Sequence, residues 1–200
     1  MICRRCKSEF EPYRRNGIVI SRLCIKCVVL KNKEQMKKKQ LQLQREAKKE
    51  LLTHSDYQNL LQKQINKLVR IIDVDFTCIA RDTRKGKMNA GHYFSVGSNN
   101  SLRFNLHNIH KQSEYSNKYN HGDAIMYLIG IKKRYGIDYA NYLLSLPELY
   151  PYIKLTIPEL IEKIEIVKKI IREHKSENLK KTEIIEIREK YNKIIGIYDN

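Results

Sequence analysis

Four cysteines near the start of the chain are the residues whose types and spacing point most directly to a chemical role. They follow the pattern Cys-x2-Cys-x17-Cys-x2-Cys, at Cys3, Cys6, Cys24 and Cys27. Each short pair can form a tight turn, and four thiolates can complete a tetrahedron around zinc. Sulfur would fill every position, so we expect this zinc to fold the module and to carry no reaction. Unmetallated thiols, or a disulfide within each pair, are the alternative.

A second group of polar residues lies in the segment NAGHYFSVGSNNSLRFNLHNIHKQSEYSN. His92 closes an apolar stretch typical of a strand, and Asn108, His110 and Asn117 follow a loop rich in Gly, Asn and Ser. A histidine at a strand end, near oxygens that can hold a divalent cation, suits a metal-dependent nuclease, because imidazole can take a proton from water. Isolated His and Asn residues are also common turn formers and backbone caps. The residues alone leave both interpretations open.

The charge of the chain predicts its partner. Lys and Arg number 39 against 22 Asp and Glu, a net charge of +17. Residues 1–50 hold 15 of these cations and 5 of the acidic residues, which places +10 in the first quarter. Such a field attracts phosphate polyanions, so we expect nucleic acid as the partner. The cations that we expect to bind its phosphates are Arg4, Arg5, Arg14, Arg15, Lys37, Lys38, Lys39, Arg84, Lys85, Lys87, Arg103, Lys111 and Lys118.

The sequence also predicts the compartment. It has no run of about 18 apolar residues, and the start MICRRCKSEF lacks the apolar region of a signal peptide. We therefore expect a cytoplasmic protein with no membrane partner. The fifth cysteine, Cys78, has no neighbour in the sequence, and we expect it to be reduced and buried.

Apolar spacing predicts the elements that position these groups. The turn signal Asn16-Gly17 predicts a hairpin-like knuckle within residues 1–27, followed by an exposed, partly helical basic linker over 28–52. A packed helix is expected from Thr53 or Ser55 to Ile72. Two apolar runs, Phe76 to Ala80 and Met88 to Phe94, predict a β-hairpin.

Three further helices are expected in the second half of the chain. Asp123 is expected to cap a helix that ends at Gly136. Thr156 begins TIPE, a capping box that predicts a helix through Ile171. The last helix is expected over about 182–195.

Several segments carry a family resemblance. The runs NAGHYFSVGSNNSLRFNLHNIHKQ, SNKYNHGD, YLIGIKKRYG and LTIPELIEKI, with the paired cysteines, resemble the lambdoid phage NinG family, also called Rap, of recombination endonucleases. The resemblance covers about residues 1–175. It implies an HNH-type, ββα-metal nuclease that uses Mg²⁺ or Mn²⁺ to cut branched DNA such as Holliday junctions and D-loops.

With that resemblance, the expected fold is α+β, in which α-helices wrap a small ββα-metal core. The expected domains are a zinc-binding knuckle at 1–27, a basic helical linker at 28–52, a nuclease domain at 53–175 and a C-terminal helical extension at 176–200.

The resemblance also implies roles for individual residues. His92 would be the general base, Asn108 would orient it, and Asn117 would help to hold the divalent ion. His110 lies within the matching stretch and is a further catalytic candidate. Asn89 is a second candidate ligand of the divalent ion. The family usually has Asp at this position, so here an amide replaces a carboxylate.

A second departure concerns structural zinc. Family members tend to carry two more Cys-x-x-Cys pairs around the nuclease core, whereas here Cys78 is followed by Arg81 and the later pair is Ser113 and Ser116. We therefore expect no second zinc. Apolar packing must then hold the core together, through Tyr93, Phe94, Leu102, Phe104 and Ile109.

Two other functions stay open. A protein that binds branched DNA without cutting it would also keep this fold, and Asn89 favours that alternative. A zinc-anchored transcription or RNA-binding factor would need stacking platforms, but many of the 13 tyrosines fall at helical core spacing. Cutting both strands of a junction together needs two active sites, so a homodimer is a further expectation.

Overall fold

The computed structural model describes residues 1–119, 122–174 and 181–198. The chain folds as two compact units, Met1–Leu52 and Thr53–Asn200. Among the described residues, no helix has the length and apolar character needed to cross a membrane.

The first unit combines a small hairpin with one long helix. Strands β1 (Arg14–Arg15) and β2 (Ile18–Val19) pair antiparallel, joined by Asn16 and Gly17 at φ values of 50° and 77°. These positive φ values suit the tight turn that an Asn-Gly pair favours, so the predicted hairpin is confirmed. Helix α1 (Ile25–Glu50) then runs without a break for 26 residues, about 39 Å at 1.5 Å per residue.

Helix α1 differs from the expected linker because it starts within the cysteine module. Its first turn contains Cys27, and the guanidinium of Arg5 donates to both carboxylate oxygens of Glu34 at 2.6 and 3.2 Å. Knuckle and linker therefore belong to one structural unit. The helix follows from the high helix propensity of its Lys, Gln and Glu residues.

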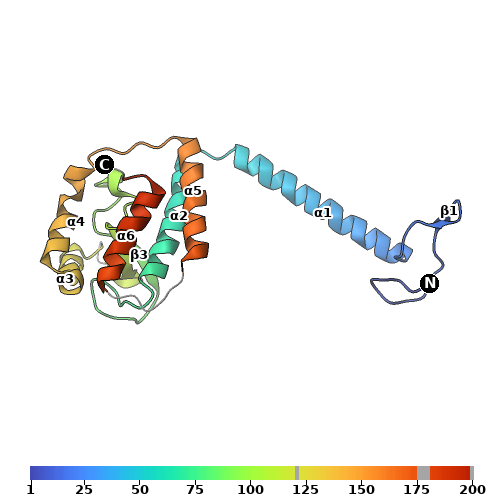
Figure 1. The fold of residues 1–200 in the computed structure, drawn as a ribbon, viewed down its shortest axis with the longest axis horizontal. Coiled ribbons are helices and arrows are strands. Elements are labelled where there is room, and N and C mark those ends of the chain that lie inside the picture. The colour runs from blue at the N-terminus through green and yellow to red at the C-terminus, as the bar shows by residue number, and fades with distance from the viewer. Residues whose placement is uncertain (120–121, 175–180, 199–200) are drawn as a thin grey trace. The chain divides into compact units, whose positions relative to one another are not determined.

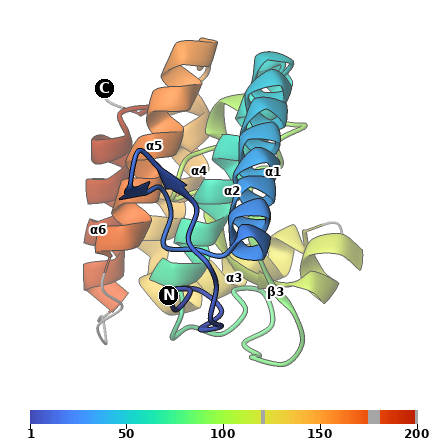
Figure 2. The same ribbon diagram turned by 90° about the vertical axis from the view of Figure 1, so that its right-hand side faces the viewer.

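Two helices with capping boxes form one side of the second unit. Helix α2 (His54–Ile72) starts at Thr53, whose side chain and that of Asp56 each bind the other's backbone amide. Helix α5 (Ile157–Glu173) starts in the same way at Thr156. The apolar faces of α2 and α5 pack against each other, with α6 (Lys181–Ile195) beside α5 (Figures 1 and 2). The predicted helix start at Thr53 and the predicted capping box at Thr156 are confirmed.

The sheet of this unit differs from the predicted hairpin. Strand β3 (Met88–His92) pairs antiparallel with β4 (Ile109–Ser113), with His92 opposite Ile109. The run Phe76 to Ala80 forms no strand, so the predicted partner of β3 was wrong. This run is apolar because Cys78, Ile79 and Ala80 are buried in the core, where Ile79 packs closely under Gly130.

Short helical segments follow each strand. The loop after β3 contains the single 3₁₀ turn η1 (Asn100–Leu102), and β4 leads into the π-helical turn η2 (Tyr115–Tyr119). The order is thus strand, loop, strand and helical turn. Leu102, Phe104 and Ile109 are buried in the loop and in β4, and Tyr93 and Phe94 pack against the core, which confirms the expected apolar packing.

Helices α3 (Ala124–Tyr135) and α4 (Ile137–Leu149) flank Gly136, whose φ of 93° ends α3 as expected. Asp123 occupies the predicted N-cap position of α3 with a φ of 53°, but its side chain makes no capping hydrogen bond, and its carboxylate lies 3.7 Å from Arg81 Nε. Helix α4 was not predicted, and Pro147 lies in its last turn.

The C-terminal helix is part of the core and not an extension. Arg188 of α6 is fully buried and pairs at 2.6 Å with Asp73, which follows α2 and is also fully buried. The boundary that we expected at residue 176 lies outside the described residues, but those from 181 onward pack in the same unit as 53–174.

Candidate metal centre and active site

The four paired cysteines come together in the N-terminal part of the first unit. Their sulfur atoms all lie within 4.8 Å of one another, and those of Cys6 and Cys24 are 3.7 Å apart. Tetrahedral zinc with bonds of about 2.3 Å needs sulfur atoms about 3.8 Å apart. The cluster could therefore hold a metal ion such as zinc, and the donor set is one that zinc prefers.

The protonation of these thiols explains what a cation would add. The backbone amide of Cys6 lowers the pKa of Cys3 to about 6, so Cys3 is a thiolate at neutral pH. Burial raises the pKa of Cys27 to about 12, and the neighbouring cysteine side chains raise it as well. A bound dication would favour the ionised form of all four cysteines.

His92 ends β3 with one ring nitrogen hydrogen-bonded, and the residue lines a cavity. Its Nε2 lies 2.9 Å from the carbonyl oxygen of Arg103. A carbonyl only accepts, so Nε2 carries the proton and Nδ1 has the free lone pair. Burial lowers the pKa of His92, which keeps the ring neutral at pH 7.

Asn108 fixes the loop that surrounds this histidine. Its buried amide accepts a hydrogen bond from Phe94 N at 2.8 Å and donates to Phe94 O at 3.0 Å and Leu102 O at 3.1 Å. Its own carbonyl accepts from Tyr93 N at 2.9 Å. Asn108 therefore holds the residues after His92 against the loop, without contacting the ring.

Asn117 and His92 line the same cavity. This cavity has a volume of about 240 Å³ and is open to solvent, and Tyr93, Ser95, Val96, Gly122 and Ala124 complete its lining. The two residues come from the first strand and from the helical turn after the second, so the fold unites positions that are far apart in the sequence.

Two other candidates are not brought to this cavity. Asn89 does not line it, and side chains alternate along a strand, so Asn89 and His92 point to opposite faces. His110 is fully buried, with Nδ1 3.0 Å from the hydroxyl of Tyr127, and burial holds its pKa well below the usual value. We therefore correct both assignments: Asn89 is no ligand beside His92, and the ring of His110 cannot reach a substrate.

The cavity offers few ligands for a divalent ion. Asn117 supplies an amide oxygen and Ser95 a hydroxyl, but no carboxylate is among the lining residues that the structure describes. Mg²⁺ usually binds one or two carboxylates and completes its shell with water and substrate phosphates. These residues could hold a divalent cation only weakly by themselves.

The structure brings together segments at which family members tend to have their further cysteine pairs. Cys78 Sγ accepts a hydrogen bond from Ser113 N at 3.2 Å, and the hydroxyls of Ser113 and Ser116 are 3.4 Å apart. Arg81 instead stacks at 4.2 Å on the ring of Tyr115. Hydrogen bonds and a cation–π contact thus join the segments at this point, and within the described residues only the N-terminal cysteines form a metal-binding group.

Three of the expected DNA-binding cations have structural partners. The guanidinium of Arg84 donates to the carbonyl of Asp75. The guanidinium of Arg103 donates to the amide of Asn59 on α2 at 2.8 Å, and Lys111 Nζ donates to the carbonyl of Val74 at 2.9 Å. Lys87 and Lys118 both pair with Glu114, but exposed pairs of this kind are weak enough to exchange for phosphate. The remaining cations of the set, Arg5 paired with Glu34 among them, are exposed.

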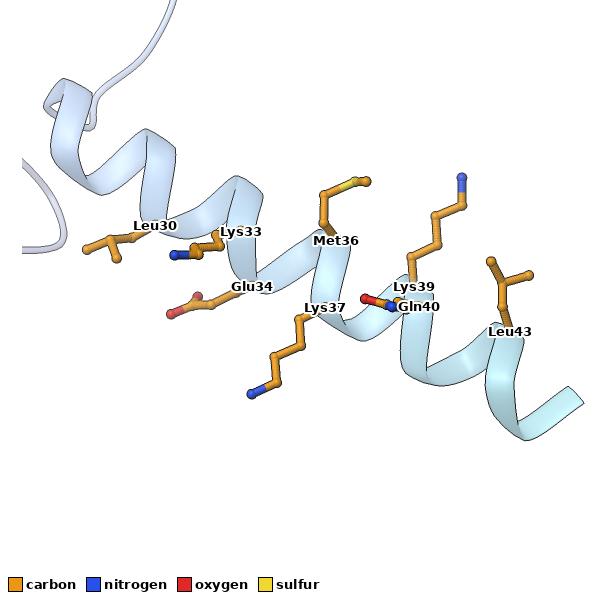
Figure 3. Close-up of a pocket in the computed structure, with 8 residues that line it drawn as sticks. All are labelled: Leu30, Lys33, Glu34, Met36, Lys37, Lys39, Gln40 and Leu43. Carbon is orange, nitrogen blue, oxygen red and sulfur yellow. The ribbon is translucent and has the colours of Figure 1, made fainter. Parts of the chain in front are cut away.

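Side chains along α1 border a shallow hollow, drawn in Figure 3. A single helix cannot enclose a ligand, so we interpret the hollow as solvated surface. Lys37 and Lys39 extend from different sides of the helix (Figure 3), as expected for residues about 200° apart around its axis. The three lysines at 37–39 therefore cannot all contact one phosphate strand.

Sequence reasoning missed the carbonyl of Arg103 as the partner of His92, because a backbone group leaves no signal in residue type. It also missed Tyr127, whose hydroxyl donates to Gly91 O at 3.0 Å and links His110 to β3. A tyrosine at core spacing in α3 gave no indication of that contact.

The fold and the site together define a class of protein: a basic α+β chain with an N-terminal metal module and a strand–loop–strand–turn motif that presents a half-buried histidine. The family model described as "Bacteriophage Lambda NinG protein" matches residues 1–177, so the chain belongs to the NinG family. Protein ninG of Escherichia phage lambda is 34% identical over 76 residues, which are 38% of this chain and 37% of that protein. Protein ninG of Salmonella phage P22 is 34% identical over 77 residues, 38% of each chain.

These alignments span well under half the length of the relatives. No solved structure matches the chain.

Proposed function

We propose that this protein is an endonuclease that uses Mg²⁺ or Mn²⁺ to cut branched DNA, such as Holliday junctions and D-loops formed in recombination. The observation that carries the proposal is the cavity shared by His92, at the end of a strand, and Asn117, in the helical turn that follows the second strand. This order of elements is the one that an HNH-type, ββα-metal nuclease requires.

In this proposal His92 is the general base. Its Nδ1 accepts no hydrogen bond from any described residue, while its Nε2 is held by Arg103 O. The neutral ring can take a proton from a water molecule in the cavity, and that water then attacks the phosphorus of a phosphodiester. Asn108 acts as a positioning residue, since it holds the loop whose carbonyl orients the imidazole.

The divalent cation would be held by the amide of Asn117 and by phosphate oxygens of the substrate. When bound, it would stabilise charge on the phosphate and on the leaving oxygen. The scarcity of protein ligands predicts that the cation binds weakly to the free protein and more tightly with DNA present.

Both units offer cations to the DNA backbone. In the first unit, Arg4, Arg14 and Arg15 are exposed around the metal module. In the second, the segment Arg84 to Lys87 leads into β3, which ends at His92. Phosphate contacts of this kind position a duplex without reading its sequence, as a structure-selective enzyme needs. Concerted cutting of both strands would require two copies of the chain.

A second candidate function is binding of branched DNA without cleavage. The observation that favours it is the absence of a carboxylate from the described residues that line the cavity. A nuclease centre that depends on a divalent ion usually has at least one.

Cleavage of a synthetic four-way junction tests the proposal. Purified protein is incubated with the junction, or with a linear duplex of the same sequence, in Mg²⁺, Mn²⁺ or chelator. The proposal predicts cuts in the junction that need the divalent ion, with little cutting of the duplex. Tight junction binding with no cut strand in either metal would reject the nuclease and support the binder.

A further inference from the structure

Helix α6 contacts the backbone on both sides of Asn108. Arg188 Nη1 donates to the carbonyl of Leu106 and, at 2.7 Å, to that of Ile109. Asn192 Oδ1 accepts a hydrogen bond from Leu106 N at 3.1 Å. The two residues are one turn apart, and both are buried. The position of Asn108 is therefore set from the C-terminal helix as well as from its own side chain.

The turn after α6 holds the other part of the loop. The hydroxyl of Tyr198 donates to Ser101 O at 2.7 Å and accepts from Phe104 N at 3.2 Å. These two contacts flank Arg103, whose carbonyl binds His92. Tyr198 is 6% exposed, and its ring packs edge-on against Tyr150 with centroids 5.0 Å apart.

A buried ion pair joins these contacts to the sheet. Arg188 Nη2 lies 2.6 Å from one carboxylate oxygen of Asp73, and the other oxygen accepts from Lys111 N of β4 at 2.8 Å. Arg188 and Asp73 are both fully buried, so neither charge can be met by water if its partner moves. Helix α6 is thus fixed to α2, to the loop and to β4 together.

The residues of α6 and of the turn after it that make these contacts, Arg188, Asn192 and Tyr198, lie beyond the segment that the family model matches, which ends at residue 177. We infer that α6 and Tyr198 form a clamp that positions the proposed catalytic histidine, by fixing the loop from Ser101 to Ile109 that carries Arg103 O and Asn108. The inference rests on the proposed function, because a clamp on this loop has a catalytic effect only if His92 is the base. Asn192 and Tyr198 are its positioning residues.

Two matched tyrosine variants test the clamp in the full chain. Tyr198→Phe keeps the ring and removes the hydroxyl that holds the loop. Tyr191→Phe is the control, since Tyr191 also belongs to α6 but its hydroxyl lies 2.7 Å from Nδ1 of His174, away from the loop. For each variant, kcat and KM are measured on a four-way junction, and hydrogen exchange is measured at the amide of Phe94, which reports on the bond to Asn108.

The clamp predicts that Tyr198→Phe lowers kcat at least about tenfold with KM unchanged, because small displacements of catalytic groups reduce the rate while the DNA-binding cations stay in place. It also predicts faster exchange at Phe94 in this variant and wild-type values of both quantities in Tyr191→Phe. Asn192→Ala, which loosens the loop from α6 itself, must behave like Tyr198→Phe. This second variant keeps the test decisive if one substitution impairs folding.

Equal kcat in Tyr198→Phe and Tyr191→Phe, or exchange at Phe94 that neither Tyr198→Phe nor Asn192→Ala changes, would overturn the clamp. Failure of the proposed function gives a different result, since the wild type then cuts no junction. In that case the exchange rates alone decide whether α6 holds the loop.

Discussion

Nε2 of His92 lies 2.9 Å from the carbonyl oxygen of Arg103, and this bond ties the end of β3 to the loop before β4. The contact fixes the tautomer that leaves Nδ1 free. Burial lowers the pKa of the same ring, which is protonated only below the usual value of 6.5.

The first prediction concerns the pH dependence of cleavage. A general base works only when it is unprotonated, so the cleavage rate should rise as pH increases through the pKa of His92 and then become constant. Because this pKa is lowered, the midpoint should lie below 6.5. Single-turnover rates between about pH 5 and 8 measure it. A midpoint above 7 would show that another group is the base.

The second prediction concerns Asn108. Asn108→Ala removes three side-chain hydrogen bonds, to Phe94 N, Phe94 O and Leu102 O, and leaves those groups buried. At about 1 kcal/mol each, the free energy of unfolding should fall by about 3 kcal/mol. Urea unfolding followed by tyrosine circular dichroism measures the change, because every tyrosine except Tyr13 lies in the second unit. A loss below about 1 kcal/mol would contradict the role of Asn108.

The third prediction is one zinc ion per chain. Cys24→Ser should abolish zinc binding, whereas Cys78→Ser should leave it unchanged, because Cys78 contacts Ser113 and no other cysteine. Metal analysis of the purified proteins gives the stoichiometry. Two equivalents of zinc per wild-type chain would refute the expectation that this chain lacks the second structural zinc site.

A gain-of-function variant extends this test. Arg81→Cys, Ser113→Cys and Ser116→Cys together place three thiols around Cys78, and the chain should then bind two equivalents of zinc. The contacts of Ser113 with Cys78 and Ser116 support this expectation. A stoichiometry that stays at one in a folded variant would show that the four positions do not converge as described.

The fourth prediction concerns acid stability. Burial lowers the pKa of His107 to about 4, although Glu189 opposes the shift, and burial also holds the pKa of His110 well below its usual value. These histidines are therefore protonated near pH 6.5 in the unfolded chain but stay neutral in the folded chain. The free energy of unfolding should fall as pH decreases, because protonation favours the unfolded chain. His107 alone should account for about 3 kcal/mol between about pH 6.5 and 4.

The readout is the slope of the unfolding free energy against pH, followed by the tyrosine signal. His107→Phe should reduce this slope by about 1.4 kcal/mol per pH unit below pH 6. An unchanged slope would mean that His107 is protonated in the folded protein, held by its contact of 3.1 Å with Glu189.

The fifth prediction separates DNA-binding cations from structural ones. Lys85 is exposed, so Lys85→Ala should reduce the dependence of log Kd on log salt concentration by about one unit. Lys111→Ala should leave that slope unchanged and lower stability instead, because Lys111 donates to the carbonyls of Asp73 and Val74. A loss of slope in Lys111→Ala would show that this lysine does contact phosphate.

The comparison of sequence and structure shows where residue patterns are informative. The caps at Thr53 and Thr156 and the cysteine spacing were predictable, because each depends on a few neighbouring residues. The partner of β3 was not, since the apolar run at Cys78 to Ala80 is buried in the core beside α3 without forming a strand itself. Periodicity cannot separate these two origins of a short apolar run.

For the candidate site, the sequence indicated His92, Asn108 and Asn117 but not their partners. The tertiary fold turns Asn89 from the cavity and buries His110, and neither effect has a signal in the sequence. The contribution of α6 was also hidden, because Arg188 appears in the sequence as one more exposed cation of an amphipathic helix. Its full burial depends on Asp73, 115 residues earlier in the chain.

The most direct measurement of the central claim is the single-turnover rate at which His92→Ala cuts a four-way junction in saturating Mg²⁺. His54→Ala is the matched control, because His54 also binds a backbone carbonyl, that of Leu155 at 2.7 Å, but does not line the cavity. We predict that His92→Ala cuts at least about a hundredfold more slowly than the wild type with unchanged junction affinity, and that His54→Ala cuts normally. Cleavage by His92→Ala at the wild-type rate would contradict the assignment of His92 as the base.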